Sequence, residues 1–171
     1  APGSWRGMVA PVNPGKVVAR RLLDEPQPAP AGWKLSTLDE LGPEAFNQIM
    51  LRASDGDPYD TSTAESAEDD FRELVEAAGT AFDAGSWFVL SDAHGDVGVV
   101  LPQVFPEDLT TGTLFYVAVL PERRGEGLGR AVHAFGLSEL ARRGARSYVG
   151  STDPDNTPMI AIFEANGCTL S

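Results

Sequence analysis

The chain has 171 residues, of which 42% are hydrophobic and 22% are charged, and its net charge is −12 at pH 7. This length fits one domain with a sizeable core, and no apolar stretch is long enough for a membrane span. The acidic balance disfavours nucleic acid and favours cationic partners. Because the single cysteine, Cys168, cannot form an internal disulfide and the N-terminus lacks a signal pattern, we expect a cytoplasmic protein.

Residues 1–32 are predicted to form an N-terminal arm that precedes a compact domain over residues 33–171. Six prolines fall in this segment, and the Pro-Gln-Pro-Ala-Pro run at 26–30 favours extended polyproline geometry. Exposed sheet edges invite pairing with another strand. We therefore expect a strand from residues 5–12 or 16–23 to cover an edge of the sheet, in the same chain or in a dimer partner.

Two helices are predicted next along the chain. Apolar residues recur at three- and four-residue steps over residues 43–53. A second helix is predicted over residues 62–78, because Ser62-Thr63-Ala64-Glu65 has the spacing of a capping box and Gly79 suits the helix end. The stretch between positions 54 and 78 is rich in acidic residues and contains one basic residue, Arg72. We interpret them as a solvated face and polar loop, with attraction of ammonium substrates as the alternative.

The hydrophobic period then changes to that of β-strands. Residues 87–90 and 97–104 are predicted strands joined by a hairpin turn at Asp92-Ala93-His94-Gly95, and residues 113–120 form a third. The remaining predicted elements are a helix over residues 128–143, a strand over 146–151, and a helix that begins at Thr157-Pro158 and stops at Asn166-Gly167.

A glycine-rich turn, Arg124-Gly125-Glu126-Gly127-Leu128-Gly129, joins the third strand to the helix after it. Glycines let the backbone approach an anion and point N–H groups at it, while the helix N-terminus adds positive partial charge. The spacing is not that of a dinucleotide fingerprint, and no Gly-Lys-Ser/Thr follows. The turn therefore predicts an anionic ligand, with a glycine-rich connection that binds nothing as the alternative.

Residues 119–129 resemble motif A of the GNAT acetyltransferase superfamily, whose signature Arg/Gln-x-x-Gly-x-Gly/Ala is filled by Arg124, Gly127 and Gly129. Residues 156–167 resemble the family's second signature, an Asn that begins a helix ending before Gly-Phe. The resemblance covers the chain from about residue 33 onward. It implies an α/β (α+β) fold, with a mixed, mainly antiparallel sheet flanked by helices, the order β-α-α-β-β-β-α-β-α and a truncated final strand.

The resemblance also implies a site for an acyl-coenzyme A, in particular acetyl-coenzyme A. Its pyrophosphate would bind N–H groups of residues 124–130, and its pantetheine arm would lie in a slot between residues 117–119 and 151–153. A main-chain amide around Ala118 would hydrogen-bond the thioester oxygen, and Asn156 would bind near the pantetheine. The residues expected to bind the coenzyme are Val117, Ala118, Val119, Arg124, Gly125, Glu126, Gly127, Leu128, Gly129, Arg130, Asn156 and Phe163.

Proton transfer is where the sequence departs from the family pattern. Phe163 stands where many members carry a proton-donating Tyr, and Ser151 stands where protein N-terminal acetyltransferases carry a Glu. An amine must lose a proton before it attacks, so a base is expected. The candidate catalytic residues are Tyr116, Ser151 and Asp153, with core packing for Tyr116 and loop capping for Asp153 as alternatives. His133 is expected to pack, and no metal site is predicted.

The sequence thus predicts an N-acyltransferase that moves an acetyl or similar acyl group from acyl-coenzyme A to an amine by direct attack in a ternary complex. The acceptor is expected to be a small-molecule or peptide amine that carries positive charge. The alternative is a non-catalytic acyl-coenzyme A binding or sensing module, motivated by Phe163 and Ser151. A third hypothesis is a structural domain that has lost the ligand.

Overall fold

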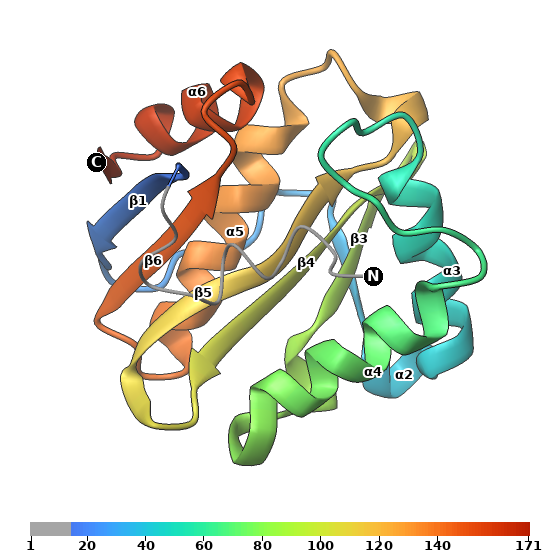
Figure 1. Ribbon diagram of the computed structural model, residues 1–171, viewed down its shortest axis with the longest axis horizontal. Helices are drawn as coiled ribbons and strands as arrows, with labels where there is room; N and C mark the ends of the chain where they lie inside the picture. Colours follow the sequence, from blue (N-terminus) through green and yellow to red (C-terminus); the bar gives the residue numbers. More distant parts are fainter. Residues whose placement is uncertain (1–14) are drawn as a thin grey trace.

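The computed structural model describes residues 15–171, which form a seven-stranded sheet with helices on both faces (Figure 1). The strands are β1 (Val17–Leu22), β2 (Lys34–Thr37), β3 (Phe88–Asp92), β4 (Gly95–Phe105), β5 (Asp108–Val119), β6 (Ser147–Thr152) and β7 (Thr169–Leu170). Their order in the sheet is β2-β3-β4-β5-β6-β1-β7. All neighbours are antiparallel except β5 and β6, which are parallel. The predicted fold class is confirmed.

Helices α2, α3 and α4 cover one face of the sheet, and α5 and α6 cover the other (Figure 1). The helices are α2 (Leu38–Leu41), α3 (Pro43–Ser54), α4 (Ala67–Ala78), α5 (Leu128–Arg142) and α6 (Thr157–Ala165), with short 3₁₀ turns η1 (Gly79–Ala81), η2 (Ala84–Ser86) and η3 (Pro121–Arg123). Within residues 15–171, no helix has both the length and the apolar character that crossing a membrane requires.

Alternating side chains of the central strands divide the hydrophobic core into two parts, one on each face. Leu90 and Val100 pack in the core beneath α5, whereas their neighbours Val89 and Val99 pack beneath α3 and α4. Consecutive strand residues point to opposite faces, so both cores draw on the same strands. A shift of one residue in strand register would exchange the two sets of side chains, and the cores therefore fix the register.

Helix α2 was not predicted from the sequence, and β2 was expected only as the first strand of the implied order, without bounds. The four residues of α2 are too few to show an apolar period, but a capping box defines its start. Thr37 Oγ1 accepts a hydrogen bond from Glu40 N at 3.2 Å, and the Glu40 carboxylate accepts one from Thr37 N at 3.1 Å. The other predicted strands and helices are found within a few residues of their expected bounds.

The start of α4 differs from the prediction, whereas the start of α6 agrees with it. The prediction of a capping box at Ser62 is wrong, because the N-cap of α4 is Ser66. The Ser62 hydroxyl instead donates to Asp70 Oδ2 at 3.0 Å and so belongs to the loop before the helix. The last helix, α6, begins at Thr157 as predicted, and its N-cap is Asn156, whose side-chain oxygen accepts a hydrogen bond from Met159 N at 3.3 Å.

Strand β1 lies inside the sheet, between β6 and β7, although it comes from the segment predicted as an arm. It pairs with β6 along its whole length, and its Ala19 and Arg20 pair with β7. A strand from residues 16–23 thus joins the sheet within the same chain, but it lies inside the sheet and not at its edge. Residues 5–12 lie outside the described part of the chain, and the division into domains at residue 33 stays a prediction.

Gly98 in β4 lies close to the backbone of β5. A Cβ atom at this position would lie 2.3 Å from the Ala118 carbonyl oxygen, far inside van der Waals contact. The obstacle is backbone rather than a flexible side chain, so a larger residue could fit only if the strands separated.

We expect Gly98→Ala to lower the free energy of unfolding by about 3 kcal/mol, since the added methyl group overpacks a buried backbone contact. Gly32→Ala is a control, because Gly32 has φ 84° but open space around its Cβ direction. That change adds only backbone strain of about 1–2 kcal/mol. Urea unfolding measures both values, and a Gly98→Ala cost no larger than that of Gly32→Ala would contradict the prediction.

Candidate functional site

A cleft opens where β5 and β6 diverge. The two strands pair only near their starts, at Thr111 with Ser147 and at Gly112 with Tyr148. Beyond that point, residues 117–119 and 151–153 line opposite parts of a cleft with a volume of about 1150 Å³. The parallel pairing therefore ends early, and within residues 15–171 the later part of β5 pairs only with β4.

A bulge in β5 lies beside this cleft. The register with β4 shifts between Val100 and Pro102, so that Phe115 and Tyr116 together lie opposite Leu101. Phe115 and Tyr116 both pack in the core beneath α3 and α4. The bulge thus directs the Tyr116 side chain to the α3–α4 face of the sheet while Tyr116 also lines the cleft.

The glycine-rich turn leads from the end of β5 into α5 and lines the same cleft. Gly125 and Gly127 have φ angles of 83° and 77°, in the left-handed region that favours glycine. Gly127 is the N-cap of α5 and contributes no side-chain cap. The first N–H groups of α5 are therefore exposed beside the cleft, where the helix end attracts anions. Gly129 also permits close contact with α6, because a Cβ there would lie 2.9 Å from Ile162 Cδ1.

Arg124 connects the glycine-rich turn to β5 and to α3. Its Nη2 donates a hydrogen bond to Ala53 O at the end of α3, at 2.9 Å, and its Nε donates to Val119 O at 3.4 Å. The guanidinium lies close to Gly56, where an added Cβ would be 3.1 Å from Nη1. Arg124 therefore holds the turn in place and adds positive charge at the cleft wall.

Arg123 anchors the turn from the other side, a role that we did not predict from the sequence. It is 8% exposed and donates two hydrogen bonds to Asp92, Nη2 to Oδ2 at 2.7 Å and Nη1 to Oδ1 at 3.0 Å. These bonds lower the pKa of Asp92 to about 2. Glu126 also turns toward Arg123, with 3.3 Å between Oε2 and Nε. Glu126 does not line the cleft, whereas every other predicted coenzyme-binding residue does.

The Arg123–Asp92 pair predicts a loss of stability in acid. Because the pKa of Asp92 is lowered in the folded state, the pair's contribution is complete above the ordinary value of roughly 3.9 and is lost as pH falls through about 2. We expect Asp92→Asn to be less stable than the parent at neutral pH, with the difference shrinking between about pH 4 and 2. Urea unfolding across this range measures it, and a constant difference would contradict the prediction.

The three predicted catalytic candidates, Tyr116, Ser151 and Asp153, all line the cleft. Ser151 is buried in β6. The Asp153 carboxylate accepts a hydrogen bond from Asp155 N at 3.0 Å and lies 3.8 Å from Lys16 Nζ. Asp153 therefore caps its own loop and has a cation beside it, an arrangement that fits the loop-capping alternative.

Tyr59 is a cleft residue that sequence reasoning missed. It lies in the loop between α3 and α4, where the Asp-, Gly- and Pro-rich composition shows no period that could single it out. Desolvation, together with the negative charges of Asp153 and Asp155, raises the pKa of Tyr59. Its phenol is therefore neutral at physiological pH and faces the carboxylates at the end of β6.

Asn156 joins the start of α6 to the end of β6. Its Nδ2 donates to Thr152 Oγ1 at 3.0 Å, and its Oδ1 caps the helix. The side chain thus fixes the wall of the cleft opposite β5, and both its donor and its acceptor atoms have partners within the chain.

Phe163 is 1% exposed and packs against a buried polar network. Its ring lies 5.6 Å from the His133 ring. His133 Nδ1 is 2.8 Å from Asn166 Nδ2, a donor, so Nδ1 accepts and Nε2 donates to Tyr148 Oη at 3.3 Å. Burial lowers the pKa of His133 to about 4, so the imidazole is neutral and has a structural role.

Residues 48–168 match the Acetyltransferase (GNAT) family. This match covers the bulged β5, the glycine turn, the cleft and Asn156, and the chain belongs to the GNAT acetyltransferase family.

Individual proteins resemble the chain over most of its length. A mycothiol acetyltransferase from Saccharomonospora viridis is 32% identical over 150 residues, 81% of this chain and 46% of that protein. One from Thermobispora bispora is 32% identical over 158 residues, 88% of this chain and 52% of that protein. A solved GCN5-related N-acetyltransferase from Sphaerobacter thermophilus has the same fold, with a TM-score of 0.65, 22% identity, and coverage of 91% of this chain and 48% of that chain. The chain spans about half the length of these proteins.

Proposed function

We propose that the protein is an N-acyltransferase that moves an acetyl or similar acyl group from acyl-coenzyme A to an amine. The observation that carries the proposal is that the uncapped start of α5 and the unpaired side of β5 line one continuous cleft. The first feature suits the phosphates of the coenzyme, and the second suits its extended pantetheine arm. Membership of the acetyltransferase family supports the same conclusion.

The residues of the cleft fit acyl-coenzyme A. Gly125 and Gly127 keep the turn free of side chains where a pyrophosphate would approach the backbone. Arg124 and Arg130 line the same end and complement its negative charge. When bound, the coenzyme supplies an acyl group already activated as a thioester. Gly129 lets α5 lie close to α6, and Asn156 ties the start of α6 to the end of β6, on the side where the pantetheine arm would lie.

The thioester oxygen needs an N–H donor as negative charge develops on it. Leu120, just after β5, donates its N–H to Val97 O in β4 at 2.9 Å. Hydrogen-bonded pairs alternate along an antiparallel ladder, so the N–H of Ala118 also faces β4. The N–H groups of Val117 and Val119 then face the cleft, and we assign the donor to one of these two instead of Ala118.

Direct attack by the amine suits the groups that the cleft contains. A leaving thiol with a pKa of roughly 8–9 departs without much help from an acid, so Phe163 at the position of the usual Tyr is compatible with turnover. The amine must first lose a proton, and Asp153 and Asp155 are cleft carboxylates that can accept it directly or through water. Tyr59 is neutral at working pH and is suited to orient the acceptor by hydrogen bonding.

Two measurements on the chain test the proposed function. Calorimetric titration with acetyl-coenzyme A is expected to show saturable binding, and release of free thiol is expected with at least one member of a panel of alkyl amines, aminoglycosides and peptide N-termini. Firm binding without thiol release from any amine would favour the non-catalytic module. No binding would favour a structural domain.

The glycine turn gives a sharper prediction. We expect Gly127→Ala to raise the Kd for acetyl-coenzyme A about tenfold, because a side chain disfavours the left-handed conformation by roughly 1–2 kcal/mol and the turn relaxes away from the phosphates. Gly144→Ala is the matched control, since Gly144 also has a positive φ, 94°, and open space but lies beyond the other end of α5. Equal Kd values for the two variants would refute the assignment of the turn.

A further inference from the structure

Lys16 places a primary amine inside the proposed coenzyme cleft. It lies directly before β1 and lines the cleft together with residues 117–119 of β5, beside which the thioester would lie. The other basic residues that line the cleft within residues 15–171 are Arg123, Arg124 and Arg130. A guanidinium stays protonated in proteins, whereas a lysine amine can lose its proton and attack a carbonyl group. Lys16 is therefore the one described side chain of the cleft with the chemistry of an amine acceptor.

The pairing of β1 with β6 fixes the backbone of Lys16 beside the end of β6. Val17 lies opposite Thr152 in this antiparallel ladder, so the residue before Val17 extends toward the loop after β6. Lys16 Nζ is 3.8 Å from Asp153 Oδ2, whereas Asp153 Oδ1 accepts the hydrogen bond from Asp155 N. One oxygen of the carboxylate is thus bound to its own loop, and the other faces the amine.

The contact between Lys16 and Asp153 is easily broken. Their separation of 3.8 Å exceeds the length of a normal hydrogen bond, and the two side chains are 34% and 36% exposed. Ion pairs at such exposure contribute little to stability. The lysine amine lies at the end of a flexible four-carbon stem. It can therefore move from the carboxylate into the cleft at small cost.

Asp153 is also close to a residue that we assign to the acceptor. Desolvation raises the pKa of Tyr59, and the negative charge of Asp153 raises it further, so the two side chains lie near each other. Lys16 and Tyr59 are therefore both near the same carboxylate, which is a candidate base for the incoming amine. The Lys16 amine thus lies where an acceptor amine would lose its proton.

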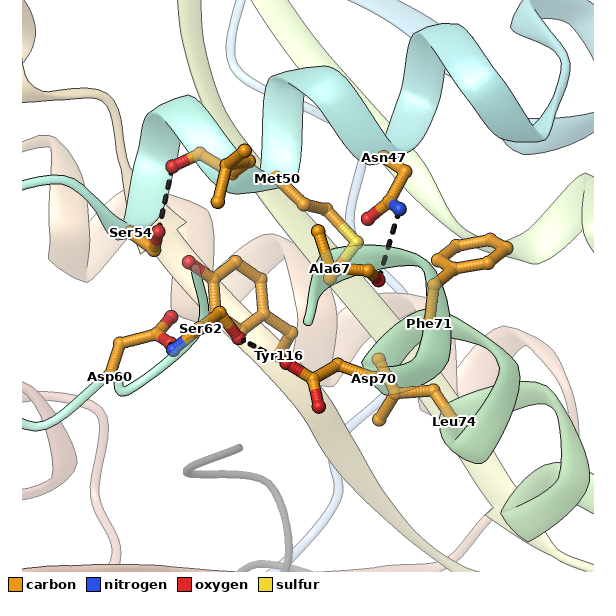
Figure 2. Close-up of a pocket in the computed structure, with 11 residues that line it drawn as sticks. Asn47, Met50, Ser54, Asp60, Ser62, Ala67, Asp70, Phe71, Leu74 and Tyr116 are labelled. Carbon is orange, nitrogen blue, oxygen red and sulfur yellow. Dashed lines mark hydrogen bonds between the residues drawn. The ribbon is translucent and has the colours of Figure 1, made fainter. Parts of the chain in front are cut away.

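On its other side, Tyr116 adjoins a small space that leaves little room for an amine. This space lies between α3, the loop before α4, and β5, and its volume is about 30 Å³ (Figure 2). Hydrogen bonds within the chain hold its residues: Asn47 Nδ2 donates to a main-chain carbonyl of α4, and Ser62 Oγ donates to Asp70 Oδ2, both at 3.0 Å. An amine in the cleft therefore stays beside β5, where the acyl group would be.

We propose that the chain acetylates its own Lys16, with acetyl-coenzyme A as the acetyl donor. This inference rests on the proposed function. The Lys16 ammonium group gives one proton to Asp153 Oδ2, and the neutral Nζ attacks the carbonyl carbon of the thioester. A C–N bond forms as the C–S bond breaks, and the second proton lost by the nitrogen goes to the departing thiolate. Each event yields one N-acetyllysine and one free thiol, and Asp153 returns its proton to water.

The chain contains two lysines, Lys16 and Lys34, and the second is an internal control. Lys34 is exposed on β2, at the edge of the sheet far from β1. Chemical acetylation without a binding site would favour this more exposed amine. After incubation of the chain with acetyl-coenzyme A, peptide mass spectrometry is expected to show Lys16 acetylated at least about tenfold faster than Lys34, because the cleft holds amine and thioester together. Equal rates, or faster modification of Lys34 or of the N-terminal amine, would overturn the proposal.

Three variants localise the reaction. The parent chain is expected to release one equivalent of thiol without any added amine. Lys16→Arg keeps a positive charge beside Asp153 but is expected to abolish this release, whereas the matched Lys34→Arg is expected to retain it. Asp153→Asn is expected to slow acetylation of Lys16 at least about tenfold, because the proton acceptor is lost, and to leave the rate at Lys34 unchanged. An undiminished thiol release in Lys16→Arg would contradict the assignment.

Two kinetic measurements show whether the reaction occurs within one cleft. The rate constant for acetylation of Lys16 is expected to be independent of protein concentration and to saturate with acetyl-coenzyme A. Gly127→Ala is expected to raise the half-saturating concentration about tenfold, in parallel with its Kd. A rate constant that rises in proportion to protein concentration would indicate transfer between chains and would refute the proposal.

Thiol release with added amines separates this inference from the proposed function. Release beyond one equivalent with an added amine, while Lys16 stays unmodified, would leave the proposed function intact and refute self-acetylation. Acetylation of Lys16 without further release from any added amine would support self-acetylation and refute transfer to a separate acceptor. Neither modification nor release would refute both.

Discussion

The early end of the pairing between β5 and β6 is the constraint on which the rest of the site depends. Backbone N–H and C=O groups in a protein need partners, and a strand that loses its neighbour offers its own to whatever lies beside it. After Gly112, β5 keeps β4 on one side and faces the cleft on the other. The close approach at Gly98 keeps β4 tight against this part of β5. The open side of β5 is therefore rigidly held.

Two arginines hold the turn that follows β5, and each contacts a different part of the fold. Arg123 reaches back to Asp92 at the β3–β4 hairpin, and Arg124 reaches Ala53 at the end of α3. Three of the six residues of the turn are glycine, so side-chain packing within the turn contributes little to its shape. Its geometry thus depends on its neighbours. This arrangement keeps the N–H groups of α5 accessible while the turn stays ordered.

Charge is distributed unevenly along the cleft, in spite of the net charge of −12. Arg124 and Arg130 belong to the glycine turn and the start of α5, whereas Asp153 and Asp155 follow β6, with Lys16 beside Asp153. An anionic coenzyme and a cationic acceptor would each meet complementary charge, and each would avoid the binding region of the other. The bulge at Phe115 and Tyr116 directs the Tyr116 side chain to the α3–α4 face, while Tyr116 also lines the cleft.

The sequence predicted the elements that have a clear local pattern, but not the contacts between residues that are far apart in the chain. The long helices α3 and α5 and the strands β3 to β5 show clear periods, and the glycine turn has a recognisable spacing. The prediction of a capping box at Ser62 was wrong because these residues belong to a loop. The Ser62 hydroxyl donates a hydrogen bond to Asp70, which is 5% exposed, and therefore does not cap the helix. The partner of Arg123 is 31 residues away in the chain, and no local pattern identifies it. Tyr59 becomes a cleft residue only because the fold brings the loop between α3 and α4 to the same cleft as the end of β6.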